Sequence, residues 1–409
     1  MELNPDMPTS VETLSPSAVA SRPLRIGIDA RTLSGPFTGD RTYWRGLIGG
    51  LAKIDSVNRY FIYTREPVAG TPPETGPNFT WRTARTPGND ALWMQFQFPR
   101  LLAQDDVDIG HTQYNIPLLT IPCPIVTTIG DITFALFPDQ FLPRDRFILN
   151  QFIPRSLRKA AGILAVSEST RRDILRRYKH IIAPEKVVTT LLAAHEQFRP
   201  IPEAEFTEMQ ARVCENAGIP RTPYILSVGV LQPRKNLTTL LDAFALVKLG
   251  KLAPPHKLFI AGKRGWLNED LDKQLAALPT EVAKDILFLG YVPDHELPDL
   301  YAGAEMFCYP STYEGFGLPP LEAMACGCPV LCSETSSLPE VVGDGGILLP
   351  SKDSDAWARA IEKLIERPEL RPRWGERGVA RAAQFSWTNT AQKTLETYIE
   401  LRRPVTDAS

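Results

Sequence analysis

The sequence carries almost no net charge, no long apolar run and no cysteine framework. Its 45 Lys and Arg residues nearly balance 47 Asp and Glu residues, whereas a protein that binds nucleic acid needs a clear excess of positive charge to meet the phosphates. Because no segment reaches about 18 consecutive apolar residues, none is predicted to span a membrane. The 6 cysteines lack the spacing of a zinc site and are too sparse for a disulfide scaffold. We therefore expect a cytoplasmic protein with reduced thiols and no nucleic-acid partner.

Three recognisable segments are absent as well. Residues 1–23 contain acidic residues, prolines and serines but no apolar core, which argues against a signal peptide and predicts a disordered tail. No G-x-G-x-x-G follows the first predicted strand, which argues against a dinucleotide-dependent oxidoreductase. No Asp-x-Asp pair stands in a context that indicates a clamp for a divalent ion. The last absence favours chemistry that needs no metal.

What the chain does have is a repeated alternation of short apolar runs with longer helical patterns over its 409 residues. The first set of predicted strands is Arg25–Asp29, Tyr60–Tyr63, Ile125–Ile129, Ile163–Val166 and Val187–Leu191. The second set is Tyr224–Val228, Lys257–Ala261, Ile286–Leu289, Met306–Tyr309 and Val330–Cys332. Most of these runs are continuously apolar, as expected of strands buried on both faces of a parallel sheet.

A strand-helix alternation that occurs twice predicts two doubly wound α/β domains, the number that this length favours. The polar stretch 195–222 separates the two strand sets. We therefore assign residues 24–200 to an N-terminal and residues 201–385 to a C-terminal Rossmann-like domain. Ligands of open parallel sheets bind beyond the carboxyl ends of the strands, so we expect one cleft between the two domains.

The most informative segment is EGFGLPPLEAMACG, residues 314–327, which follows the predicted strand at 306–309. Its two prolines suit a first helical turn, and Gly327 suits the left-handed residue that ends a helix. The amide groups at that helix start would attract a diphosphate. Gly315 and Gly317 would let the backbone approach such a ligand without a Cβ in the way. The segment therefore predicts an anion-binding turn.

Charged residues surround this predicted turn. Glu314 lies in the loop, and we place Glu322 in the first helical turn, where it could accept both hydroxyls of a ribose. Glu314 could bind hydroxyls of a transferred sugar. The residues alone leave a second interpretation open, in which Glu322 only complements the helix dipole and Glu314 is a solvated loop residue. Upstream, Arg234 and Lys235 in the run GVLQPRKN could meet the same phosphates, although a basic pair by itself is weak evidence.

This segment resembles the E-x7-E signature of family 4 retaining glycosyltransferases, which have the GT-B fold of two Rossmann-like domains. The runs SVGVLQPRKNL, FIAGKRGW, FLGYVPDHEL and SSLPEVVGDGG match the family too. The resemblance covers about residues 24–401 and is most specific over residues 224–346. It implies transfer of a sugar from a UDP-, GDP- or ADP-sugar to a hydroxyl of a glycan, glycolipid or polyprenyl-linked acceptor, with retention at the anomeric carbon.

The resemblance also implies roles for individual residues. Arg234 and Lys235 would hold the donor diphosphate, with Glu314 as the third catalytic residue. The residues expected to bind the donor are Gly39, Val292, Gly315, Phe316, Gly317, Leu318 and Glu322. Since the two cations would neutralise the leaving group, neither a metal nor another cofactor is expected. The helix over residues 386–403 would cross back to brace the N-terminal domain, or pack on its own domain.

The chain departs from the family pattern at two positions. Gln232 stands where a Glu is usual, which puts in doubt a salt bridge that would orient the two cations. Gly130 stands where a His beside the donor sugar is common, although the neighbouring Asp131 remains to contact sugar or acceptor. We hypothesise that Gly130 makes room for a bulkier sugar or acceptor. His111 matches another frequent family position and is either a contact for the acceptor or sugar, or structural.

Residues 144–180 contain ten Lys or Arg residues against three Asp or Glu residues. This run forms either solvated helix faces or a patch that meets anionic lipid, or a polyprenyl diphosphate, at the inner face of the membrane. For the chain as a whole, two other functions stay open. One is a nucleotide-sugar epimerase of similar fold, and the other is a non-catalytic subunit that binds nucleotide sugars.

Overall fold

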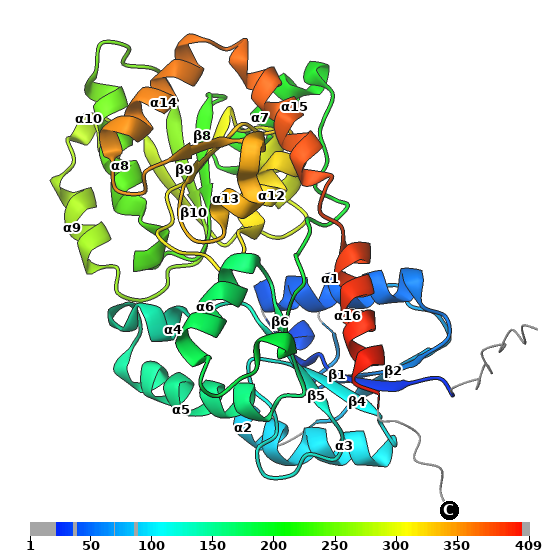
Figure 1. The fold of residues 1–409 in the computed structure, drawn as a ribbon. Coiled ribbons are helices and arrows are strands. Elements are labelled where there is room, and N and C mark those ends of the chain that lie inside the picture. The colour runs from blue at the N-terminus through cyan, green and yellow to red at the C-terminus, as the bar shows by residue number, and fades with distance from the viewer. Residues whose placement is uncertain (1–21, 36–38, 69, 86–88, 403–409) are drawn as a thin grey trace, which may run out of the picture.

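The computed structural model describes residues 22–35, 39–68, 70–85 and 89–402. The predicted tail lies almost wholly outside these residues, and residues 36–38, next to Gly39, lie outside them too. The described chain forms two parallel sheets with helices packed against them, one in each half of the molecule (Figure 1). Within these ranges no helix is long and apolar enough to cross a membrane.

Among the described residues, the N-terminal sheet has 7 parallel strands in the order β3-β2-β1-β4-β5-β6-β7, and the C-terminal sheet has 6 in the order β10-β9-β8-β11-β12-β13. The first sheet consists of β1 (Arg25–Asp29), β2 (Arg59–Thr64), β3 (Phe79–Thr83), β4 (Ile109–Gln113), β5 (Ile125–Ile129), β6 (Gly162–Ala165) and β7 (Val187–Thr189). The second consists of β8 (Tyr224–Val228), β9 (Lys257–Ala261), β10 (Ile286–Gly290), β11 (Met306–Tyr309), β12 (Val330–Ser333) and β13 (Ile347–Leu349).

Helices connect these strands and cover the sheets. Those of the first half are α1 (Gly39–Ile54), α2 (Asp90–Leu92), α3 (Phe98–Gln104), α4 (Thr133–Leu136), α5 (Pro143–Lys159) and α6 (Glu168–Tyr178). Those that follow are α7 (Glu203–Asn216), α8 (Leu237–Leu249), α9 (Glu269–Ala277), α10 (Thr280–Ala283), α11 (Leu297–Ala302), α12 (Leu318–Ala325), α13 (Leu338–Val342), α14 (Ser354–Glu366), α15 (Leu370–Ala382) and α16 (Trp387–Glu400).

The predicted class, two doubly wound parallel α/β units, is confirmed. Every strand predicted from the sequence is present with ends within two residues, but β3, β4 and β13 were missed. β3 reads FTWRT and β4 reads IGHTQ, so polar side chains interrupt the apolar run that marks a buried strand. β13 has only 3 residues. Packing between neighbouring strands, rather than a long apolar run, selects these three segments.

Both strand orders reverse at an inner position, between β1 and β4 in the first sheet and between β8 and β11 in the second. Such a switch point leaves a crevice at the carboxyl ends of the strands. Gly229, Gly262 and Gly290 stand at the ends of β8, β9 and β10 with φ of 155°, 145° and 65°. Because these φ values strain other residues, glycine is what lets the backbone turn at this edge.

The last helix, α16, returns to the N-terminal half and packs along α1 (Figure 1). A Cβ built on Gly46 of α1 would lie 2.0 Å from the indole of Trp387, and one on Gly50 would lie 2.4 Å from the carbonyl oxygen of Trp387. The two helices can therefore approach only because both positions are glycine. The limits assigned above to the two domains stay a prediction.

Candidate functional site

Two cations and a carboxylate meet at the switch point of the C-terminal sheet. Arg234 and Lys235 lie in the short turn Pro233–Lys235 after β8, and Glu314 follows β11. Arg234 Nη1 lies 2.5 Å from Glu314 Oε2, and Lys235 Nζ lies 2.7 Å from Glu314 Oε1. The side chains are 20%, 11% and 7% exposed, in that order. We call these three residues, which the sequence predicted as catalytic, the cation cluster.

Hydroxyl groups and a backbone bond hold the cation cluster in place. Tyr309 Oη and Ser311 Oγ lie 2.9 Å and 2.7 Å from the carboxylate oxygen that Lys235 also contacts. Lys235 Nζ donates to Tyr309 Oη at 2.5 Å. The amide of Thr312 donates to the carbonyl of Arg234 at 2.8 Å, which ties the cation turn to the loop after β11. The charges are therefore fixed by their surroundings before any ligand binds.

The pKa values in the cluster follow from burial and from the paired charges. Burial alone would raise the pKa of Glu314, but the charges of Arg234 and Lys235 outweigh it and lower this pKa to about 2. For Lys235, burial is the largest effect and the charge of Arg234 adds to it, so its pKa is lowered to about 8. Burial also disfavours the charge on Arg234, yet Glu314 raises its pKa. At neutral pH the cluster therefore carries a net positive charge, with Lys235 close to its titration.

Gln232 helps to orient the guanidinium although it has no charge. With its amide oxygen turned toward Arg234, Gln232 Oε1 lies 3.0 Å from Nε and 3.2 Å from Nη2. Arg234 Nη1 also donates to the carbonyl of Tyr313 at 3.0 Å. The salt bridge that the sequence put in doubt is replaced by hydrogen bonds that Arg234 donates to a neutral amide at the same position.

The turn after Glu314 offers amide groups without partners. No described residue accepts a hydrogen bond from the N–H groups of residues 315–318. Gly317 precedes α12 with φ of 111°, a conformation that favours glycine. Pro319 and Pro320 occupy the first helical turn, as predicted, and have no N–H. The backbone N–H groups that could bind an anion therefore lie mainly in the turn and not in the helix.

Glu322 lies further along α12 than expected. The helix begins at Leu318, so Glu322 is in the second turn and its placement in the first turn is wrong. Its Oε2 accepts a hydrogen bond from Tyr301 Oη at 3.0 Å, and no described residue bonds to its Oε1. Burial raises the pKa of Glu322 to about 7. α12 ends, as predicted, before a left-handed glycine, Gly327, with φ of 75°.

The N-terminal half touches this turn directly. A Cβ built on Gly315 would lie 2.0 Å from the carbonyl oxygen of Gly130, which follows β5. Ser167 Oγ and Thr170 Oγ1, at the start of α6, donate to the carbonyl of Gly315 at 2.5 Å and 3.0 Å. Gly315 therefore permits the contact between the two halves in addition to any approach of a ligand.

The space beside Gly130 is already filled, which corrects the hypothesis that this glycine makes room for a bulkier sugar or acceptor. A Cβ built on Gly130 would lie 2.3 Å from the hydroxyl oxygen of Tyr114. A histidine at this position would overlap that tyrosine. The sequence could not show this, because Tyr114 follows β4, a strand that the apolar pattern missed.

Two carboxylates belong to the wall that faces the cation cluster. Asp131 follows β5, and Asp40 is the second residue of α1. The charge of Asp131 acts on both Arg234 and Lys235 and favours their protonated forms. Burial, followed by the charge of Asp131, raises the pKa of Asp40 to about 6. The N-terminal wall is therefore acidic where the C-terminal wall is basic.

His111 does not join this group. It lies within β4 and is fully buried, with Nδ1 2.5 Å from Tyr398 Oη and Nε2 2.8 Å from Thr128 Oγ1. Burial lowers its pKa to about 3. Both ring nitrogens are engaged inside the molecule, so His111 holds β4, β5 and α16 together, and the structure gives no support to an acceptor contact.

The other residues predicted to bind the sugar donor differ in the groups that they can present to it. The side chain of Phe316 is buried edge-on against Phe385, so only its backbone can meet a ligand. Gly39 begins α1, with no described atom within 4 Å of a built Cβ. Leu318 and Val292 pack on the apolar core. In the described part of the chain, no group of three or more His, Cys, Asp or Glu residues could hold a metal ion.

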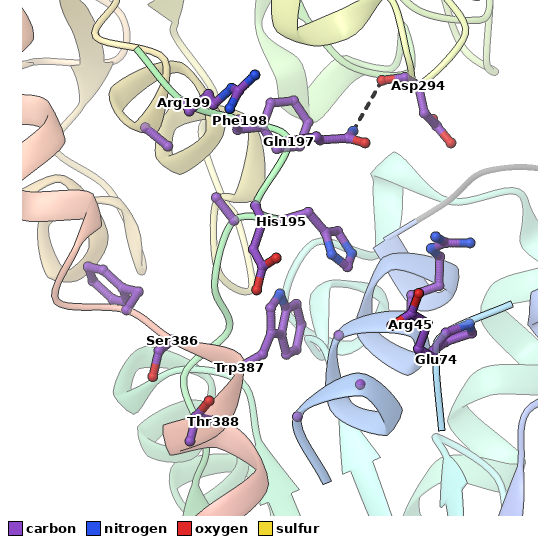
Figure 2. Close-up of a pocket in the computed structure, with 18 of the residues that line it drawn as sticks. Arg45, Glu74, His195, Gln197, Phe198, Arg199, Asp294, Ser386, Trp387 and Thr388 are labelled. Atoms are coloured by element: carbon purple, nitrogen blue, oxygen red, sulfur yellow. Dashed lines mark hydrogen bonds between the residues drawn. The ribbon is translucent and has the colours of Figure 1, made fainter. Parts of the chain in front are cut away.

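A cavity of about 1360 Å³ lies between the two halves (Figure 2). Arg41 and Arg45 of α1 line one side, and Asp294, in the loop after β10, lines another. His195, in the linker between the sheets, also lines the cavity, and Figure 2 shows it close to Trp387. Tyr291 and Pro293, on either side of Val292, contribute as well. The loop that contains Val292, a residue expected to bind the donor, therefore faces this open space.

Comparison with known proteins matches both halves of the chain. Residues 43–190 match the family described as Glycosyltransferase Family 4, and residues 215–381 match Glycosyl transferases group 1. The O-antigen chain mannosyltransferase B of Escherichia coli is 39% identical over 274 residues, which cover 67% of this chain and 69% of that protein. The chain belongs to the family 4 glycosyltransferases. The predicted membership and the predicted class of enzyme are thereby confirmed.

Other similar proteins agree with this assignment. The serotype-specific mannosyltransferase WbdA of Escherichia coli is 30% identical over 300 residues, which cover 71% of this glycosyltransferase but only 36% of WbdA. Sucrose-phosphate synthase from Thermosynechococcus elongatus has a TM-score of 0.69 at 21% identity, over 93% of this chain and 99% of that one. Anabaena HepE, solved with UDP and glucose, has a TM-score of 0.67 at 18% identity, over 92% and 100%. These structures confirm the GT-B fold.

Some residues that hold the site together were not predicted from the sequence. Tyr309 ends β11 and Ser311 follows two residues later, in the run YPSTYEG. Polar groups directly after a buried parallel strand lie at the edge where ligands bind, and this signal could have found both. Asp40 was overlooked too, although it directly follows Gly39.

Proposed function

We propose that this glycosyltransferase moves a hexose from a nucleoside diphosphate sugar to a hydroxyl of a glycan or lipid-linked acceptor, with retention at the anomeric carbon. The observation that carries the proposal is the cation cluster beside the unpartnered amides of residues 315–318. Cations and converging amide dipoles are what a diphosphate requires. Glu322, with one carboxylate oxygen unbonded among the described residues, suits the hydroxyls of the ribose.

The cluster would act mainly on the leaving group. When the bond from the anomeric carbon to the phosphate oxygen breaks, negative charge grows on the diphosphate and the sugar becomes oxocarbenium-like. A charge pair about 4 Å apart is worth up to about 4 kcal/mol at an effective dielectric constant of about 20. Because Tyr309 and Ser311 hold the carboxylate that positions Arg234 and Lys235, little reorganisation is needed as this charge develops.

A front-face displacement gives retention without an enzyme nucleophile. The acceptor oxygen forms its bond to the anomeric carbon on the face from which the phosphate oxygen departs. The acceptor proton passes to that phosphate oxygen, which is becoming more basic as its bond breaks. Arg234 and Lys235 would hold the diphosphate in place for this transfer, so the step balances with no further reactant.

We propose that the reaction needs no metal, because the two cations and the turn amides supply the positive charge that a divalent ion supplies in other transferases. Treatment with EDTA is expected to leave the rate unchanged. A loss that Mg²⁺ or Mn²⁺ restores would contradict this part of the proposal.

Mannose is the proposed sugar, because two relatives of this chain are named as mannosyltransferases. One of them is named for an O-antigen chain, which supports a glycan acceptor. HepE, of the same fold, was solved with UDP and glucose, so UDP-glucose is the main alternative donor. GDP-mannose and UDP-glucose therefore come first in a panel of donors, followed by ADP-glucose.

The experiment incubates the purified protein with each donor, with and without mannose-terminated oligosaccharides or a polyprenyl-linked glycan. We expect one donor to give acceptor-dependent release of nucleoside diphosphate, and nuclear magnetic resonance of the product to show the anomeric configuration of the donor. A change of the donor sugar without acceptor would instead identify an epimerase. A ligand-dependent rise in melting temperature without any turnover would identify a binding subunit. Either of these results would overturn the proposal.

We also propose that α5 contacts anionic lipid. Cationic and apolar side chains recur on this helix at every third or fourth residue and so share its outer face. They are Arg144, Phe147, Ile148, Phe152 and Arg155, all exposed. Aromatic and basic side chains on one face are typical of helices that lie in a membrane interface. In α6, by contrast, Arg171 pairs with Glu168 and Arg176 pairs with Asp173. The proposed lipid contact therefore involves α5 and not the whole basic region 144–180.

Sedimentation with lipid vesicles tests this contact. We expect binding to vesicles that contain phosphatidylglycerol and weak binding to vesicles of phosphatidylcholine alone. Phe147→Ser should weaken binding, whereas Val57→Ser, at a side chain that is also 67% exposed but lies far from α5 in the sequence, should not. Equal binding to both kinds of vesicle, or no binding, would contradict the proposal.

A further inference from the structure

Tyr114 reaches the site from β4, a strand that the apolar pattern of the sequence does not reveal. It directly follows β4, and its amide donates to the carbonyl of Thr128 in the neighbouring β5 at 3.0 Å. Its φ is 58°, a left-handed conformation that is unusual for a tyrosine and persists only where the surroundings hold it. The ring packs on the apolar cluster beside β5 and β6. The hydroxyl occupies the space where a side chain of Gly130 would lie.

The contacts of Gly130 place this hydroxyl at the meeting point of the two halves. The hydroxyl oxygen lies 2.3 Å from the point where a Cβ of Gly130 would be. The carbonyl of the same glycine meets Gly315, which begins the stretch of unpartnered amides. The charges of Arg234, from the C-terminal wall, and of Asp131, from the N-terminal wall, both act on Tyr114. Tyr114 therefore stands beside the cation cluster although it belongs to the other half.

The hydroxyl of Tyr114 has a proton that it can donate to a ligand. The hydroxyl is influenced by the backbone amide of Asp131, which lowers its pKa but is outweighed by burial. Its own proton is accepted by none of the described residues. Burial is the main reason that the pKa of Tyr114 is raised well above its usual value, so the group stays protonated and neutral at physiological pH. A neutral donor next to a diphosphate site suits a sugar hydroxyl better than it suits a phosphate.

We propose that Tyr114 donates a hydrogen bond to a hydroxyl of the transferred sugar and thereby helps to select the donor. This inference rests on the proposed function, because it requires a diphosphate bound by the cation cluster and the amides of residues 315–318. The sugar attached to that diphosphate would lie next to Gly315 and Gly130, where the tyrosine hydroxyl is placed. A site that offers a hydrogen bond to one sugar hydroxyl disfavours sugars in which that hydroxyl is missing or points elsewhere.

The test removes only the hydroxyl. Tyr114→Phe is expected to lower kcat/KM for the best donor by about tenfold, the usual effect of one lost hydrogen bond, and to leave the affinity for the sugar-free nucleoside diphosphate unchanged. Tyr178→Phe is the matched control, because the Tyr178 hydroxyl is also buried in the same apolar cluster without a bonded partner. The control should not change kcat/KM.

Deoxy donors sharpen the test. If the hydroxyl of Tyr114 bonds to one sugar hydroxyl, the donor that lacks this hydroxyl should react equally well with the wild type and with Tyr114→Phe. Loss of affinity for the sugar-free nucleotide in Tyr114→Phe, an unchanged kcat/KM, or an equal loss with every deoxy donor would overturn the inference. Failure of the proposed function gives a different result, because then Lys235→Met would also bind the nucleoside diphosphate as tightly as the wild type.

An exchange of side chains gives an independent test. Gly130→His should be nearly inactive, because the imidazole would overlap Tyr114. The double variant Gly130→His with Tyr114→Ala should recover part of the activity, since it removes the overlapping ring. Equal activity of the single and the double variant would show that the two positions do not share one space and would contradict the inference.

Discussion

The two walls of the candidate site are built in opposite ways. On the C-terminal wall the charged groups are paired with one another, since Glu314 contacts Arg234, Lys235 and two hydroxyl groups. On the N-terminal wall Asp131 bonds to a nearby backbone amide, and no described residue accepts the hydroxyl proton of Tyr114. The charged groups of the C-terminal wall are paired before a ligand binds. The N-terminal wall, in contrast, has hydrogen-bonding groups to which a ligand can bond.

This difference fits the two tasks of a glycosyl transfer. A leaving diphosphate is the same for all sugars carried by one nucleotide, so fixed charges can stabilise it in every reaction. The sugar and the acceptor differ between substrates, and a neutral hydroxyl can distinguish them by hydrogen bonding. Substitutions on the C-terminal wall should therefore lower turnover with every donor, and substitutions on the N-terminal wall should change the choice of sugar.

The largest effect is expected from removing one charge of the C-terminal wall. Lys235→Met keeps an apolar side chain of similar length and deletes the ammonium group, so kcat should fall by about 10²–10³ with every donor. Steady-state kinetics with two donors measures this. Lys352→Met, at an exposed lysine, is the control and should have little effect. A loss confined to one sugar would break the distinction between the walls.

The next largest effect is expected from Glu314→Gln. The charge of Glu314 opposes the burial of Lys235, so without it the pKa of this lysine drops below about 8 and the ammonium is partly lost at neutral pH. We expect kcat at pH 7 to fall by about 10² and the alkaline limb of the pH profile to move to lower pH. Thermal unfolding checks that the variant is folded. An alkaline limb at its original pH would show that Glu314 does not tune the lysine.

A smaller effect is expected where the two walls touch. In Gly315→Ala the added methyl group would lie 2.0 Å from the carbonyl oxygen of Gly130, so the two halves must separate locally. We expect the KM for the donor to rise by about tenfold, since a misplacement of the order of 1 Å is costly at such sites. Gly49→Ala is the control, because nothing lies within 4 Å of a Cβ built there. Equal KM values in the two variants would contradict the observed contact.

The smallest effect concerns pH in the wild type. Below a pH of about 7 Glu322 becomes protonated and loses its ability to accept ribose hydroxyls, because burial raises its pKa. Above a pH of about 8 Lys235 loses the proton that stabilises the diphosphate. The value of kcat/KM for the donor should therefore be highest between these pH values and decline on both sides. In Glu322→Gln the acid limb should disappear, and its persistence would assign that limb to another group.

The C-terminal wall was largely predictable from the sequence. Arg234 and Lys235 follow the largely apolar β8, Glu314 follows the apolar β11, and the carboxyl ends of parallel strands share one edge. Their mutual ion pairing was not predicted, because spacing along the chain does not show whether two loops meet. The helical turn of Glu322 was misplaced because α12 begins only at Leu318.

The N-terminal wall was less predictable for a physical reason. Tyr114 lies beside Gly130 only because β4 and β5 are neighbours in the sheet, and β4 is too polar to be recognised as a buried strand. The sequence drew attention to Gly130 but gave no sign of what fills the space beside it. Burial of His111 depends on α16 returning to the first half, a contact between residues 287 positions apart.

Calorimetric binding of UDP and GDP at pH 8, in buffers with different ionisation enthalpies, tests the central claim most directly. If the diphosphate lies against Lys235, whose pKa is about 8, the better-binding nucleotide should draw about half a proton from the buffer in the wild type. Lys235→Met should take up correspondingly less. Identical proton uptake in the two proteins would show that the diphosphate does not bind at the cation cluster.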